Sequence, residues 1–194
     1  MGKLDLDDVI LAIREGEGGA IQGRTRLQKI AYFVTYLLRD DIAVDPGFTA
    51  HHYGPYSSAL AATASSAVAR GVLTETSEVF PSEGFAGHDT EQKRYSYGLA
   101  PRGEAALKWR RERAGDTYKK AVDVARQIKD TGAEYRVLSY AAKAHYVLRQ
   151  EGKPITDEAI LKGAKNLGWP LTSEELKAGV ELLAELRLIT RVSS

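Results

Sequence analysis

The sequence predicts a mainly α protein with a small β-hairpin, divided into two parts. Three observations predict this class. Most segments repeat apolar residues at helical spacing, and two short strand-like segments at 72–80 and 93–99 flank a polar stretch. The turn-forming residues 130–132 then separate two helix-rich halves. We therefore expect an N-terminal domain over residues 1–130 and a C-terminal domain over residues 131–194.

The first half combines helices with short strands. Its predicted helices, each with apolar residues on one face, cover residues 5–15, 25–39, 57–70 and 101–129, the last with a break at Gly115. Its predicted strands, which alternate or carry aromatic and threonine side chains, cover residues 48–53, 72–80 and 93–99. Residues 81–92 are rich in glycine and polar side chains, so the last two strands are expected to form a hairpin with a long exposed tip.

The second half is predicted to be helical, with one short strand at its end. Its helices are expected at 134–150, 157–167 and 173–186, and the strand at 188–192. Thr172 and Glu175 have the spacing of a capping box, which marks the start of the last helix. Trp169, in the turn before it, is expected to be a core anchor.

The order of these elements is that of a winged helix-turn-helix, expected over about residues 20–110. In that arrangement the helix that begins at Ser57 or Ser58 can lie in a DNA major groove, while the hairpin, or wing, reaches the backbone or the minor groove. The C-terminal half is expected to be a second helical, winged-helix-like domain with a role in packing, dimerisation or partner binding.

Two runs of residues resemble a known family. Gly-Arg-Thr-Arg-Leu-Gln-Lys-Ile at 23–30 and His-Tyr-Gly-Pro-Tyr-Ser at 52–57 resemble the YwgA-like family of prokaryotic winged-helix proteins. They resemble, more distantly, the Panacea domain of some antitoxins. The resemblance is best over residues 20–75. It implies a regulator or a toxin–antitoxin component, and it transfers no catalytic residue.

Charge becomes informative only when it is counted locally. The 194 residues hold 27 Lys and Arg against 26 Asp and Glu, which gives a formal charge of +1. Residues 91–129, however, hold eleven basic and five acidic side chains, whereas residues 151–194 hold six basic and seven acidic ones. A basic wing beside a basic helix would be a stripe that binds phosphates, with an affinity that falls as salt rises. The alternative is a solvated helix face.

Ten residues are predicted to contact nucleic acid. They lie at the starts of two helices, in the wing and in the basic helix after it: Arg24, Arg26, Lys29, Tyr56, Ser57, Ser58, Lys93, Arg94, Arg110 and Arg111. At Arg24, Arg26 and Lys29 the alternative is a solvated face beside core residues. At 53–58 the alternative is that the string only sets the fold. The helix from Ser57 is rich in alanine and serine, so few of its side chains could read base edges.

Several functional classes are not indicated. The chain has no cysteine, which excludes disulfides and thiolate metal sites, and it holds no phosphate-binding glycine loop or nucleophile elbow. We therefore expect no enzyme activity, no catalytic residue, no metal and no cofactor. No apolar run reaches membrane-helix length, and the first residues are acidic where a secretory signal is basic, so a cytoplasmic, soluble protein is expected.

Two functions are predicted as alternatives. The first is a DNA-binding transcriptional regulator that contacts double-stranded DNA mainly through the phosphate backbone, as a possible homodimer. The second is a protein-interaction module with a protein partner, such as an antitoxin or a defence-system accessory protein. The first requires the cationic side chains to gather on one exposed ridge that carboxylates do not mask.

Overall fold

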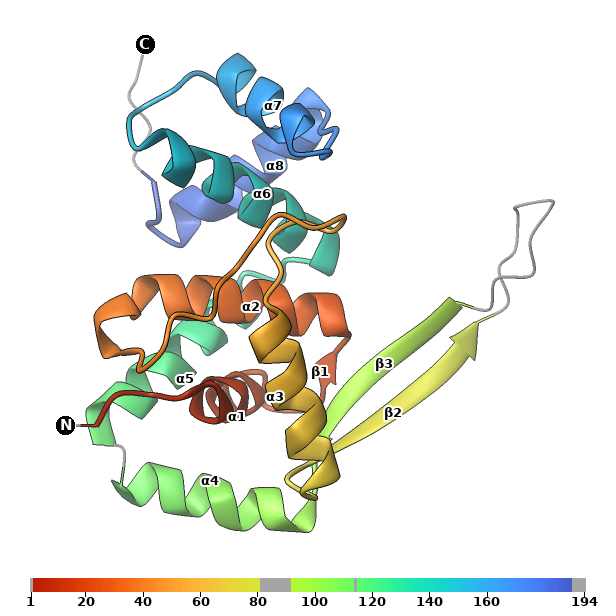
Figure 1. The fold of residues 1–194 in the computed structure, drawn as a ribbon, viewed down its shortest axis with the longest axis vertical. Coiled ribbons are helices and arrows are strands. Elements are labelled where there is room, and N and C mark those ends of the chain that lie inside the picture. Colours follow the sequence, from red (N-terminus) through yellow and green to blue (C-terminus); the bar gives the residue numbers. More distant parts are fainter. Residues whose placement is uncertain (1, 81–91, 114, 190–194) are drawn as a thin grey trace.

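The fold is mainly α-helical, with a small three-stranded antiparallel sheet (Figure 1). The computed structural model describes residues 2–80, 92–113 and 115–189. Its α-helices there are α1 (Leu6–Gly16), α2 (Arg24–Leu37), α3 (Ser58–Ala69), α4 (Pro101–Arg113), α5 (Gly115–Asp130), α6 (Tyr135–Glu151), α7 (Asp157–Asn166) and α8 (Ser173–Glu185). Its strands are β1 (Ile21–Gln22), β2 (Leu73–Phe80) and β3 (Gln92–Leu99), and a short 3-10 helix, η1, covers Arg39–Asp41. The predicted class of helices with a small hairpin is confirmed.

The helix starts follow from local capping chemistry. Asp5 and Asp8 form a reciprocal capping box at α1, and Thr172 and Glu175 form the predicted one at α8. Ser57 caps α3 through its hydroxyl oxygen, which accepts a hydrogen bond from the Leu60 N–H. The helix ends lie within two residues of those predicted.

The sheet has the order β1-β3-β2, and β3 pairs with both neighbours. The hairpin of β2 and β3 is confirmed, and it extends away from the helices (Figure 1). Its tip was predicted at residues 81–92; residues 81–91 lie outside the described residues, and Gln92 begins β3. The two-residue strand β1 was not predicted, since Ile21 and Gln22 become a strand only by pairing with Tyr97 and Ser96.

Two predicted strands differ from the structure. The prediction for 48–53 was wrong, because the chain turns back at His51–Gly54 and only Thr49 forms a β-bridge, with Tyr56. At the predicted final strand, Leu188 and Ile189 have no strand structure, and residues 190–192 lie outside the described residues.

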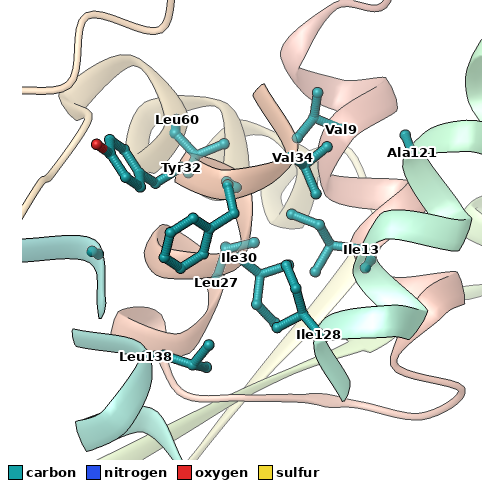
Figure 2. Packing of buried hydrophobic residues seen from close by; sticks show 14 of the residues in the cluster. Val9, Ile13, Leu27, Ile30, Tyr32, Val34, Leu60, Ala121, Ile128 and Leu138 are labelled. Carbon is teal, nitrogen blue, oxygen red and sulfur yellow. The ribbon is translucent and has the colours of Figure 1, made fainter. Parts of the chain in front are cut away.

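The core is built around α2, which lies between the N-terminal helices and α6. Figure 2 shows Ile30 and Val34 of α2 beside Ile13 of α1 and Ile128 of α5, with Leu138 of α6 nearby. Buried residues from both predicted domains belong to this one cluster. The core thus does not separate the two predicted domains, and their boundary at residues 130–131 stays a prediction. No helix in the described ranges is long and apolar enough to cross a membrane.

Candidate functional site

Four of the arginines predicted to contact phosphate are held by carboxylates of the same chain. The nitrogen–oxygen pairs are Arg24–Glu75 at 2.9 Å, Arg26–Glu17 at 2.7 Å, Arg110–Asp8 at 2.7 Å and Arg111–Glu15 at 2.9 Å. At each pair a phosphate would have to compete with a carboxylate already in place. Arg110 and Arg111 of the predicted basic stripe are thus partly masked, as are Arg24 and Arg26 at the start of α2.

Two of these arginines also connect elements of the fold. Arg24, at the first turn of α2, lies 3.6 Å from the centre of the Tyr95 ring on β3. Arg26 is half-buried. In addition to its ion pair with Glu17, it donates a hydrogen bond of 3.0 Å to the carbonyl oxygen of Ala133, between α5 and α6. These contacts give both side chains a structural role.

The hairpin carries the two wing residues of the prediction. Lys93 lies on β3 opposite Val79, and its side chain is outside the described part of the chain. Arg94 is exposed, and the register places Glu78 directly opposite it on β2. A carboxylate thus lies near this cation too, since opposed residues of an antiparallel pair share a face of the sheet.

The string from Tyr56 to Ser58 has mixed exposure. Ser57 is fully buried, and its hydroxyl donates a hydrogen bond of 2.5 Å to the carbonyl oxygen of Pro46. The Gln28 amide holds the Ser57 backbone at both its N–H and its carbonyl, at 2.9 and 3.0 Å. Ser57 therefore sets the start of α3, as the alternative interpretation held, and of Tyr56, Ser57 and Ser58 only Ser58 is exposed.

A pocket of about 460 Å³ lies between α2, α3 and the turn at residues 51–56. We call it the α2–α3 pocket. Its walls include polar and charged side chains of α2, aromatic side chains of the turn and a small side chain of α3: Arg24, Gln28, Lys29, Tyr53, Tyr56 and Ala62. Tyr56 is half-buried, and its ring lies 5.0 Å from that of His51, another lining residue. The pocket thus brings together three predicted site residues, Arg24, Lys29 and Tyr56.

Lys29 lies in the wall of this pocket and is not on an exposed face. It is only 1% exposed, and its Nζ donates a hydrogen bond of 2.7 Å to the carbonyl oxygen of Pro55. Within the described ranges no carboxylate lies within 4.0 Å of this ammonium. Burial, with repulsion from Lys143 of α6, lowers the pKa of Lys29 to about 7.

The turn closes over Lys29 because residue 54 is glycine. Gly54 has a φ of +95°, a region that L side chains rarely adopt. A Cβ atom at this position would lie 3.1 Å from Cγ of Lys143 and 3.4 Å from Nζ of Lys29. Trp169 holds the same turn from the C-terminal half, since its indole N–H donates a hydrogen bond of 2.6 Å to the carbonyl oxygen of His51.

Sequence reasoning missed Lys143, His51 and Tyr53 as members of this site. Lys143 comes from α6, more than a hundred residues after Lys29, and no spacing rule connects the two. The distinctive Tyr-Gly-Pro-Tyr string at 53–56 was the available signal, and it does lie at the pocket.

A second pocket, of about 380 Å³, lies at the other end of α2 and includes Tyr32 and Arg149. Beside it, His145 is buried, and its Nδ1 lies 2.9 Å from the Tyr32 hydroxyl. Burial, with repulsion from Arg149, lowers the pKa of His145 to about 4, so this histidine is neutral near pH 7 and packs between the halves. Tyr32 and Phe33, whose rings contact it edge-on, belong to the core.

Over the described residues, no group of three or more His, Cys, Asp or Glu side chains could hold a metal ion. The resemblance of residues 23–30 and 52–57 to the YwgA-like family stays a prediction. No family model matches the chain, and no curated protein matches it.

Proposed function

We propose that this chain is a protein-interaction module that binds a segment of a partner protein at the α2–α3 pocket. The observation that carries the proposal is the composition of this surface. Tyr53 is 67% exposed at the pocket, beside Tyr56 and the small side chains of α3. An exposed tyrosine beside a concave surface of aromatic and small side chains is typical of the centres of protein interfaces.

The outward face of α3 supports the same function. Its exposed side chains, all small and uncharged, are Ser58, Ala59, Ala62, Ser65, Ser66 and Ala69. A partner backbone can approach such a face closely. The face offers no Arg, Asn or Gln side chain, the residues that best read base edges in a major groove.

The masked arginines favour a protein over a phosphate backbone. A DNA-binding stripe gains affinity by neutralising phosphates and releasing their counterions. Arg24, Arg26, Arg110 and Arg111 already have carboxylate partners in this chain. An antitoxin or a defence-system accessory protein would need a partner-binding surface and no such stripe.

The test is selection of a random linear peptide display library on the full chain. We expect a family of enriched peptides that bind about tenfold more weakly to Tyr53→Ala, because an exposed aromatic anchor contributes strongly to an interface. Fluorescence anisotropy with the enriched peptides measures the affinities. Tyr135→Ala is the matched control, since Tyr135 is 49% exposed on α6, outside the pocket. No enriched peptide, or equal weakening by both variants, would contradict the proposal.

Duplex DNA is a second candidate, and the order of elements favours it. The order α1-β1-α2-α3-β2-β3, with β3 central in the sheet and the hairpin extended, supports a winged helix-turn-helix over about residues 20–110. In this candidate the chain is a regulator that binds DNA as a homodimer, with α3 and the hairpin toward the duplex. The C-terminal half then acts as a helical, winged-helix-like partner domain.

A salt titration with a fluorescent duplex tests the DNA candidate. If the wing contacts phosphates, replacing both Lys93 and Arg94 by alanine weakens binding to all sequences and lowers the slope of log K against log salt by roughly 2. Lys162→Ala with Lys165→Ala, two exposed lysines of α7, is the control. Absence of binding even at low ionic strength would remove this candidate.

A further inference from the structure

We propose that the α2–α3 pocket binds a carboxylate, carried by an acidic side chain of the partner segment, and that the Lys29 ammonium receives it. The proposal rests on the proposed protein-interaction function and states what the partner presents. It assigns to Lys29 the role of an anchor for an acidic peptide. The predicted role of Lys29 in binding DNA phosphate is a different one.

The first step of the argument is the missing counter-ion. A buried charge is costly unless an opposite charge or several hydrogen bonds compensate it. Elsewhere in this chain the compensation is visible, since the half-buried Arg26 and Arg110 pair with Glu17 and Asp8. Lys29 is more deeply buried than either arginine, and the described residues place no carboxylate within 4.0 Å of it. The lowered pKa leaves Lys29 only partly protonated near pH 7, and a carboxylate from outside would supply the counter-ion of its ammonium form.

The second step is access. Lys29 is one of the residues that line the pocket, but it is only 1% exposed, so a carboxylate reaches its ammonium only if the turn at 51–56 moves aside. An ammonium group has three N–H donors, and in the described residues the Pro55 carbonyl oxygen accepts from one of them. The Gln28 amide beside it is already engaged at both ends by Ser57. The ammonium is therefore one polar group of the pocket lining with unused hydrogen-bonding capacity.

The third step is the sign and size of the charge. Lys143 of α6 lies beside Lys29 and repels it, while Glu175 of α8 interacts with Lys143. Arg24 at the rim is already engaged by Glu75 through three hydrogen bonds. Sites for phosphate commonly use a free arginine fork or several backbone N–H groups, whereas a single ammonium matches a singly charged carboxylate.

The experiment titrates small probes into the full chain labelled with ¹³C at the alanine methyl groups. The probe is N-acetyl-aspartate N-methylamide, and the matched control is its asparagine counterpart, which has the same shape without the charge. We expect saturable shifts at Ala61, Ala62 and Ala64, which line the pocket. The affinity obtained from these shifts should be at least about tenfold weaker for the asparagine compound than for the aspartate probe. Equal binding of the two compounds, or no shift at these methyl groups, overturns the proposal.

Two variants assign the effect to this pocket. Lys29→Met should weaken binding of the aspartate probe by about tenfold or more, while Lys108→Met, at an exposed lysine of α4, should leave it unchanged. If Lys29→Met does not fold, Ala62→Leu serves instead, because it narrows the pocket from an exposed position of α3. If Lys29→Met folds and binds the aspartate probe with unchanged affinity, the role of Lys29 is overturned. If Ala62→Leu is used and its affinity is unchanged, the role of the pocket is overturned.

A third probe and the peptide selection separate the possible outcomes. Inorganic phosphate that binds more tightly than the aspartate probe would reassign the pocket to a phosphate and overturn the carboxylate. Enriched peptides that bind through Tyr53 but need no acidic residue would also overturn it, while the proposed function would stand. If the aspartate probe binds but no peptide is enriched, Lys29 remains the carboxylate site. The proposal that a partner protein carries the carboxylate is then overturned.

Discussion

Trp169→Ala is expected to lower the free energy of unfolding by about 3–5 kcal/mol, the usual cost of removing a large buried aromatic side chain. Trp169 is 1% exposed, and its ring contacts that of Tyr146 edge-on, with 5.6 Å between the ring centres. The substitution leaves a cavity next to α6. It also leaves the His51 carbonyl oxygen without the indole N–H that now donates to it at 2.6 Å.

Denaturant unfolding followed by far-UV circular dichroism measures this loss. Trp169→Phe is the control that separates the two causes, because it retains most of the ring volume and removes the N–H. We expect the phenylalanine variant to lose about 0.5–1.5 kcal/mol, the net contribution of a typical hydrogen bond, because His51 is exposed and water can reach its carbonyl oxygen. A loss below about 1 kcal/mol for the alanine variant would show that Trp169 is not the anchor of the turn at 51–56.

The stability difference between the native chain and Lys29→Met is expected to depend strongly on pH. Burial and the nearby Lys143 lower the pKa of Lys29 from 10.5 to about 7. Between these two values the unfolded chain carries a proton on Lys29 that the folded chain lacks. The native chain should therefore gain stability relative to Lys29→Met as pH rises through this window, by up to about 1.4 kcal/mol per pH unit.

Parallel denaturant titrations of the two chains between pH 6 and pH 11 measure this difference. The curve should be flat below the folded pKa, where both states are protonated, and flat again above the unfolded pKa of 10.5. Lys108→Met provides the baseline, because this lysine is exposed on α4. A flat difference across the whole range would show that the Lys29 ammonium is not buried as the structure describes, and it would remove the basis for the carboxylate site.

Local chemistry explains which elements could be predicted. Apolar spacing and caps are decided within a few residues, so the helices agree closely with prediction, and the capping box of Thr172 and Glu175 is found as expected. Strand β1 could not be predicted, since its two residues need β3, more than seventy positions later, to become a strand. The strand predicted at 48–53 does not form, because the aromatic residues that suggested it belong to a turn that packs on other elements.

The candidate site was only partly predictable for the same reason. The sequence showed that Arg24, Arg26 and Lys29 are cationic and lie near one another at the start of a helix. It could not show that Glu75 and Glu17 pair with the two arginines, or that the turn at 51–56 covers the lysine. The sequence gives the sign of each charged side chain, whereas its ability to bind a ligand depends on its partners and its burial in the fold.

The sequence by itself determined the helices, the hairpin and the distinctive strings at 23–30 and 53–58, because periodicity, capping and turn chemistry act over short stretches of chain. Only the tertiary structure decided what those strings do. It paired the arginines with carboxylates from distant segments, buried Lys29 beside Lys143, and left a pocket open in front of it. Charge compensation and burial are set by contacts between residues far apart in the chain, which no local pattern records.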